Sequence, residues 1–125
     1  MTAHIVNTQI DKKGLPATLS KQSITDLLRK ELHFKGVVFS DDMHMKAISA
    51  EYSFKEAIEK AINAGVDVLL FSGNIPDGTP ITGSSLVNII LELIKEKKLS
   101  VKSIEASYRR IMQLKHEHNA LVQKF

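Results

Sequence analysis

Short apolar runs of strand length alternate with segments of helical periodicity along this 125-residue chain. The runs cover residues 3–6, 37–40 and 66–71, and between them apolar residues recur every three or four positions. Apolar strands joined by connections long enough for a helix are typical of parallel sheets with right-handed crossovers. The chain is therefore predicted to be an α/β protein with parallel β/α units in the order β-α-β-α-β-α-α.

Capping and breaking residues predict where the first two helices begin and end. Ser20 is expected to cap a helix that closes at Gly36, because glycine adopts the left-handed conformation that ends helices. Ser53 and Glu56 have the spacing of a capping box, and Gly65 follows the helix that they begin.

Glycine and proline dominate residues 72–85, which are predicted to form a long loop after the third strand. Two further helices are expected after it. The first contains an apolar stripe between Leu86 and Ile94, and the second is capped by Ser100 and runs to about Leu121.

Composition excludes several classes of partner. Hydrophobic residues make up 43% and charged residues 25%, which is typical of a globular chain of about one domain. The net charge of +3 comes from basic residues that alternate with glutamates near the C-terminus, so no nucleic acid is expected to bind. No apolar run approaches the roughly 18 residues of a membrane span. The absence of cysteine excludes disulfides and leaves the compartment unknown, with a weak preference for the cytoplasm.

The second apolar run ends on two adjacent acids, Asp41 and Asp42. Parallel α/β proteins keep their chemistry at the carboxyl ends of their strands, so either acid is a candidate catalytic residue, although turns and helix caps are commoner roles. His44 follows without a defined ligand spacing, and no metal is expected. Because residues 73–83 also lack a phosphate-binding glycine motif, no cofactor is expected.

Several separated blocks together resemble the later part of the barrel domain of glycoside hydrolase family 3. Their order and spacing match its bacterial β-N-acetylhexosaminidase branch. The blocks are Met-Thr-Ala-His-Ile at residues 1–5, Pro-Ala-Thr-Leu-Ser at 16–20, the segment 27–48 that contains Ser-Asp-Asp-Met, Ala-Gly-Val-Asp-Val-Leu-Leu at 64–70, and Arg-Ile-Met-Gln-Leu-Lys at 110–115.

This resemblance implies that residues 1–125 are the C-terminal portion of a TIM-type (β/α)₈ barrel, a partial domain. It implies a retaining enzyme that hydrolyses terminal N-acetylglucosamine from glycans or muropeptides. In the family, the aspartate directly after the serine of the Ser-Asp-Asp motif is the nucleophile, which is Asp41 here, while Asp42 supports the loop. His4 lies in a block that resembles a pocket-lining one and is a candidate substrate-binding residue, although a lone histidine at a strand end is more often structural.

The family's acid/base, a His–Asp dyad on a loop of the Lys-His-Phe-Pro-Gly-His-Gly type, has no counterpart in this sequence. Met1 matches a methionine within the family's first block, so it is expected to be an internal residue. We therefore expect the isolated chain to be inactive or nearly so. Two alternatives remain: an inactive structural module that self-associates through unguarded strand edges, and an α/β domain that binds a small ligand unrelated to sugars.

Overall fold

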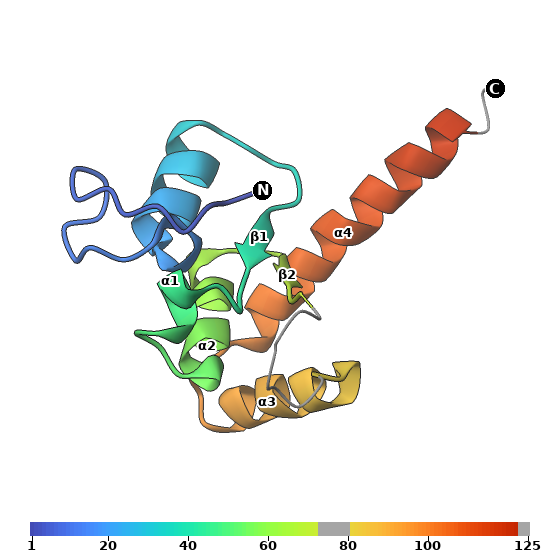
Figure 1. Cartoon of the computed structure of the whole chain (residues 1–125). Coiled ribbons are helices and arrows are strands. Elements are labelled where there is room, and N and C mark those ends of the chain that lie inside the picture. Colours follow the sequence, from blue (N-terminus) through green and yellow to red (C-terminus); the bar gives the residue numbers. More distant parts are fainter. Residues whose placement is uncertain (73–80, 123–125) are drawn as a thin grey trace.

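Two parallel strands lie at the centre of the computed structural model, which describes residues 1–72 and 81–122 (Figure 1). In the sheet, Phe39 is opposite Val68 and Asp42 is opposite Leu70. The α/β class and the parallel pairing are thus confirmed. The strands are β1 (Phe39–Asp42) and β2 (Val68–Leu70), and the helices are η1 (Ala17–Leu19), η2 (Gln22–Glu31), α1 (Lys46–Ser49), α2 (Phe54–Ala64), α3 (Gly83–Lys95) and α4 (Val101–Val122).

The predicted first strand, residues 3–6, is not part of the described sheet, and this corrects the prediction of three parallel strands. A main-chain hydrogen bond from the Thr2 N–H to the Phe39 carbonyl, at 2.8 Å, connects the segment to β1. On its other side, Val6 forms an isolated antiparallel bridge with Pro16. Proline has no N–H to donate, so this bridge does not extend into a ladder.

Both remaining strands are shifted or shortened relative to the prediction. β1 begins at Phe39, two positions after the predicted start at residue 37, and it includes both acids that were expected to follow it. β2 covers three residues of the predicted run 66–71. The main-chain carbonyl of Val38 accepts the N–H groups of both Asp67 and Val68, so the two segments already touch just before the strands begin.

The first predicted helix corresponds to η2, which is a π-helix and ends earlier than predicted. Ser20 is confirmed as a cap, since its Oγ accepts the Ser23 N–H at 3.1 Å. The prediction for Gly36 is wrong: His33, with φ of 54°, is the left-handed residue after the helix. The ring of Phe34 lies so close to Gly36 that a Cβ there would be 2.8 Å from it. A side chain at Gly36 would thus have to displace the exposed Phe34 ring, whereas the backbone angle of Gly36 is not one that favours glycine.

Helix α2 has the termini that the sequence predicts. The Ser53 side chain accepts the Glu56 N–H while the Glu56 carboxylate accepts the Ser53 N–H, which completes the capping box. At the other end Gly65 has a φ of 108°, a value that L-residues rarely adopt.

Helix α3 begins at Gly83, three positions before Leu86, because Thr82 caps it by accepting the Ser85 N–H at 3.2 Å. The end of the predicted loop is thus helical, and residues 73–80 of that loop lie outside the described residues. Ser100 caps α4 as predicted, by accepting the Ser103 N–H at 3.1 Å. No helix in the described ranges is both long and apolar enough to cross a membrane.

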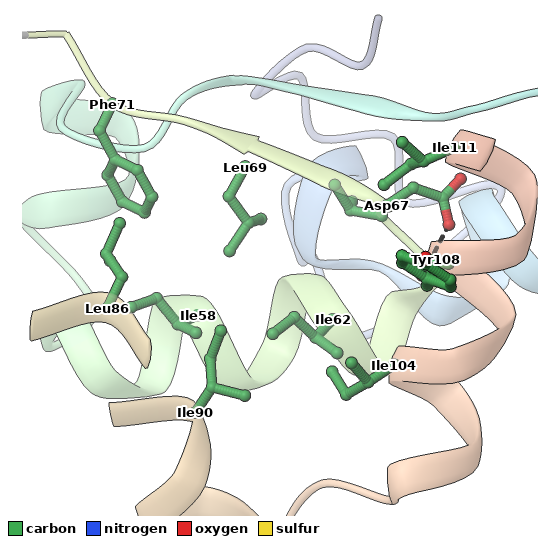
Figure 2. Close-up of a pocket in the computed structure, with 12 residues that line it drawn as sticks. Ile58, Ile62, Asp67, Leu69, Phe71, Leu86, Ile90, Ile104, Tyr108 and Ile111 are labelled. Carbon is green, nitrogen blue, oxygen red and sulfur yellow. Dashed lines mark hydrogen bonds between the residues drawn. The ribbon is translucent and has the colours of Figure 1, made fainter. Parts of the chain in front are cut away.

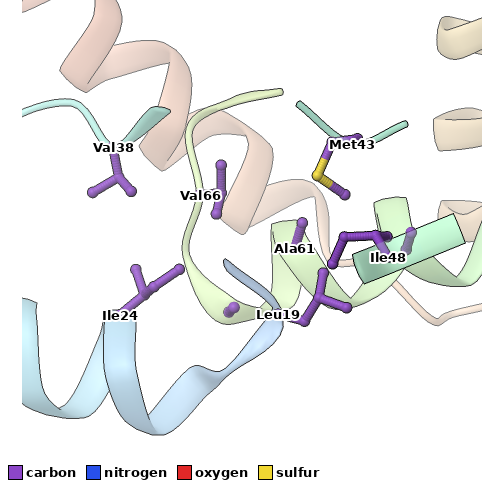
Figure 3. Packing of buried hydrophobic residues seen from close by; sticks show 9 residues of the cluster. Leu19, Ile24, Val38, Met43, Ile48, Ala61 and Val66 are labelled. Atoms are coloured by element: carbon purple, nitrogen blue, oxygen red, sulfur yellow. The ribbon is translucent and has the colours of Figure 1, made fainter. Parts of the chain in front are cut away.

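Helix α2 separates two groups of buried side chains. Its alanines face the group beneath the strands, where small side chains let the helix approach closely (Figure 3). Its isoleucines Ile58 and Ile62 face α3 and pack with Leu93 and Leu99. The group beneath the strands consists of Leu19, Ile24, Val38, Met43, Ile48, Ala57, Ala61, Ala64 and Val66.

Candidate functional site at the carboxyl end of the first strand

Strand β1 contains a bulge at the acids predicted to be functional. Between its pairings at Phe39 and Asp42 it has two residues where β2 has one, so Ser40 and Asp41 bulge. Ser40 has no exposed surface, and its Oγ accepts the Leu70 N–H at 2.8 Å. The Ser40 hydroxyl thus accepts an N–H that would be bound by a main-chain carbonyl in a regular ladder. Bulges of this kind redirect side chains near active sites.

The carboxylate of Asp42 connects the ends of the two strands. Its Oδ1 accepts the Ser72 N–H at 3.0 Å and the His44 N–H at 3.1 Å. Burial alone would raise the pKa of Asp42, but the hydrogen bonds from Ser72 and His44 outweigh it and hold the pKa below its ordinary value. Asp42 is therefore ionised, and its carboxylate holds the main chain of the segments that follow β1 and β2.

Asp41 is half-buried and less restrained than its neighbour. Its Oδ1 accepts the N–H of Asp42 at 2.8 Å. Among the residues that the structure describes, Oδ2 has no hydrogen-bond partner, and it is not one of the buried polar atoms. Within residues 1–72 and 81–122, one oxygen of this carboxylate is thus available to a ligand.

His4, which the sequence resemblance makes a candidate substrate-binding residue, lies at the same strand end. Its Nε2 is 2.9 Å from the main-chain carbonyl oxygen of Asp42, and its Nδ1 is 3.0 Å from Oγ1 of Thr18. Both ring nitrogens therefore have partners within the chain. The structure brings His4, Asp41 and Asp42 together, although they come from segments far apart in the sequence.

The ring of His44 packs against aromatic side chains. It stacks on Phe54, with ring centroids 5.8 Å apart and planes 11° from parallel, and it also contacts Phe71 at 5.4 Å. In residues 1–72 and 81–122, no group of three or more histidine or acidic side chains could hold a metal ion. The absence of a metal stays a prediction.

A cavity of about 340 Å³, whose lining includes none of His4, Asp41 and Asp42, lies between β2 and the helices α2, α3 and α4 (Figure 2). Its walls are aliphatic and aromatic side chains such as Ile58, Leu69 and Tyr108. Besides the Tyr108 hydroxyl, the polar side chains in the wall are Asp67 and Ser107, and the Ser107 hydroxyl donates to Asp67 at 2.7 Å. Such a lining provides few hydrogen bonds for a sugar, so the strand end is the better candidate site.

Comparison with known proteins decides the family. The model of the domain described as "Glycosyl hydrolase family 3 N terminal domain" matches residues 1–114. The chain belongs to this family. The prediction made from the sequence blocks is thus confirmed at the level of the family and its glycosidase class.

Two bacterial relatives named Beta-hexosaminidase show how much of a longer protein is matched. The one from Glaesserella parasuis serovar 5 is 37% identical over 131 aligned residues, which cover 98% of the chain and 37% of the relative. The one from Actinobacillus pleuropneumoniae serotype 5b is 45% identical over 78 residues, which cover 62% of the chain and 22% of the relative. The chain thus spans just over a third of the first relative, 37% of its length.

Two solved structures have the same arrangement over most of this chain. CbsA from Thermotoga neapolitana is 35% identical with a TM-score of 0.77, over 91% of the chain and 24% of that protein. The β-N-acetylglucosaminidase from Thermotoga maritima is 34% identical with a TM-score of 0.76, over 90% of the chain and 24% of that protein.

Proposed function

We propose that this chain supplies the nucleophile of a retaining β-N-acetylhexosaminidase site that acts on terminal N-acetylglucosamine of glycans or muropeptides. The observation that carries the proposal is the contrast between the two acids. Asp42 is held by two main-chain N–H groups, whereas Asp41 lies in the bulge with one oxygen available. The names of the relatives support the choice of sugar.

The chemistry requires an ionised carboxylate beside the anomeric carbon. An oxygen of Asp41 forms a bond to that carbon as the glycosidic C–O bond breaks, and the leaving oxygen takes a proton from a general acid. Water then gives a proton to the same group, now acting as a general base, attacks the anomeric carbon and releases the Asp41 carboxylate, so the configuration is retained.

The proton donor is proposed to lie outside these 125 residues. His44 is the histidine closest to the acids in sequence, and its Nδ1 is 3.8 Å from Oδ1 of Asp42. Its Nε2, however, is buried with no partner among the described residues, and its ring lies between Phe54 and Phe71. This arrangement supports a packing role for His44 and not the role of proton donor.

We further propose that the chain corresponds to the later strand–helix units of the family's barrel. Two parallel strands connected through α2, with the acids at the carboxyl end of the first, support this placement.

Two reagents separate these proposals. General acid catalysis contributes about 10²- to 10⁴-fold, so the isolated chain is expected to hydrolyse an aryl N-acetylglucosaminide more slowly than a full-length relative by at least that factor. Turnover at a relative's rate would contradict the proposed inactivity.

A 5-fluorinated N-acetylglucosaminyl fluoride tests the nucleophile alone. Its fluoride departs without a proton donor, and the 5-fluoro group slows hydrolysis of the adduct. We expect Asp41 to become glycosylated, as detected by mass spectrometry of the digested chain.

Self-association is a second candidate function. Among the described residues the sheet has two strands, so each strand has one edge without a neighbouring strand. Light scattering after size exclusion tests it: an oligomer would support this function, and a monomer at all concentrations would contradict it.

A further inference from the structure

His4 joins two parts of the chain that are 38 positions apart in sequence. Its Nε2 contacts the main-chain carbonyl oxygen of Asp42 at 2.9 Å, at the last residue of β1. Its Nδ1 contacts Oγ1 of Thr18, a side chain with no exposed surface, at 3.0 Å. The ring therefore bridges a buried hydroxyl and the end of the strand that carries both acids.

The protons of this bridge can be assigned from the chemistry of its partners. The Asp42 carbonyl can only accept, so Nε2 must carry a proton and donate it. The single Thr18 proton has three acceptors within reach: Nδ1 of His4 at 3.0 Å, the Ala3 carbonyl at 3.1 Å and Oγ1 of Thr2 at 2.8 Å. When Nδ1 of His4 carries no proton, the Thr18 hydroxyl can donate to it, and when Nδ1 carries a proton, the hydroxyl accepts that proton and donates to Ala3 or Thr2. In both states Nε2–H donates to Asp42.

This bond is one of three restraints on the bulge. The Phe39 carbonyl accepts the Thr2 N–H at 2.8 Å, and Ser40 Oγ accepts the Leu70 N–H at 2.8 Å. With the bond from His4 to Asp42, the main chain is held at the residues on both sides of Asp41. The backbone of Asp41 is thus fixed from outside while its carboxylate keeps one oxygen available.

We propose that His4 is a positioning residue, whose Nε2–H holds the Asp42 carbonyl and thereby aims the carboxylate of Asp41. This inference rests on the proposed function of Asp41. It also assigns both ring nitrogens of His4 to contacts within the chain, so a sugar hydroxyl that used either nitrogen would compete with Thr18 or Asp42.

Two substitutions separate the two ends of the ring. In His4→Gln the amide nitrogen can reach the place of Nε2 and donate to Asp42, whereas in His4→Asn the shorter amide reaches only the place of Nδ1 and Thr18. Both remove the imidazole and its charge. If His4 acted only as packing, the two variants would differ from the wild-type chain in the same way.

Labelling of Asp41 by the 5-fluorinated glycosyl fluoride is the functional measurement. We expect His4→Gln to be labelled within about threefold of the wild-type rate and His4→Asn to be slower by about tenfold or more, because small displacements of a reacting group cost large factors in rate. Rates are compared at a temperature where thermal unfolding shows each variant to be fully folded. Equal labelling rates for the two variants would overturn the proposal.

NMR provides a measurement that does not depend on sugar chemistry. The imidazole nitrogen shifts of His4 are expected to show a protonated Nε2, and the Asp42 carbonyl shift should move in His4→Asn but stay in His4→Gln. A neutral ring protonated on Nδ1 would overturn the proposal. So would an Asp42 carbonyl shift that is the same in the wild-type chain and in both variants. If the NMR result is as expected but the wild-type chain is never labelled, the contact stands and the proposed function of Asp41 fails.

Discussion

Arg110 donates two hydrogen bonds to one oxygen of Asp67, from Nη2 at 2.7 Å and from Nε at 3.0 Å. The other oxygen accepts Nη2 of Arg29 at 2.7 Å and the Val38 N–H at 2.8 Å. The Asp67 side chain has no exposed surface, so this one carboxylate joins η2, α4 and the starts of both strands.

Asp67→Asn is expected to destabilise the chain by roughly 2 to 4 kcal/mol, because a buried charge that pairs two arginines is removed. This loss of stability is smaller than that expected for breaking a fully buried ion pair, because the side chains of Arg29 and Arg110 are partly exposed to water. Urea unfolding measures it. The control is Asp26→Asn, which removes an exposed pair with Lys30 and should leave the midpoint unchanged. Equal effects of the two substitutions would contradict a structural role for Asp67.

The pH dependence of stability should report the same carboxylate. Burial alone would raise the pKa of Asp67, but hydrogen bonds from Arg110, Val38 and Ser107 outweigh it, so the pKa lies below its ordinary value. The stabilisation is then fully present above about pH 4, the unfolded pKa, and is lost as the pH falls through the folded pKa. Unfolding between pH 6 and pH 2 measures it, and the acid-induced loss of stability should be smaller in Asp67→Asn. The same loss in both proteins would contradict this assignment.

Gly65→Ala is expected to cost roughly 1 to 3 kcal/mol, because its φ of 108° is strained for alanine. An added Cβ would also lie 3.0 Å from Oγ1 of Thr25 and 3.3 Å from Cγ2 of Ile24. Gly83→Ala is the matched control, since its Cβ meets no atom within 4 Å, and it should be neutral or slightly stabilising. Thermal unfolding separates them, and equal midpoints would be inconsistent with the observed end of α2.

Leu93→Ala tests whether α3 packs on α2 as observed. Leu93 has no exposed surface and contacts the isoleucine side of α2, so its truncation should cost roughly 2 to 5 kcal/mol. Leu91, two positions earlier, is 49% exposed and serves as the control, for which the Ala substitution should cost far less. A reversed order of the two urea midpoints would show that α3 presents a different face.

The helix termini were the most predictable part of the fold, because caps are local. Ser53 with Glu56, and Gly65 after them, act as the sequence predicts. The prediction for Gly36 failed because His33 takes the left-handed conformation after the helix, and Gly36 instead lies against the ring of Phe34. Gly83 was read as a breaker, although Thr82 before it caps a helix.

The strands were less predictable, because pairing depends on partners distant in sequence. Residues 3–6 have the composition of a strand, but in the structure they contact β1 through the Thr2 hydrogen bond and do not join its ladder. The bulge at Ser40 depends on a side-chain bond to Leu70 that no local pattern specifies.

For the candidate site, the sequence named Asp41, Asp42 and His4, which the structure brings to one strand end, but it did not assign their contacts. The hydrogen bonds of His4 with Thr18 and with the Asp42 carbonyl depend on the three-dimensional fold and cannot be predicted from local sequence. Asp67 was overlooked as an anchor. Its signal is present in the sequence, since an acid between Val66 and Val68 in an apolar run must find cationic partners when it is buried.

The central proposal is that Asp41 is the nucleophile. The direct measurement is the mass of the peptide that contains Asp41 after reaction of the chain with the 5-fluorinated N-acetylglucosaminyl fluoride. We expect one added sugar on that peptide in the wild-type chain and in Asp26→Asn, and no added sugar in Asp41→Asn. An unlabelled wild-type chain, a sugar on another residue, or an adduct that persists in Asp41→Asn would contradict the proposal.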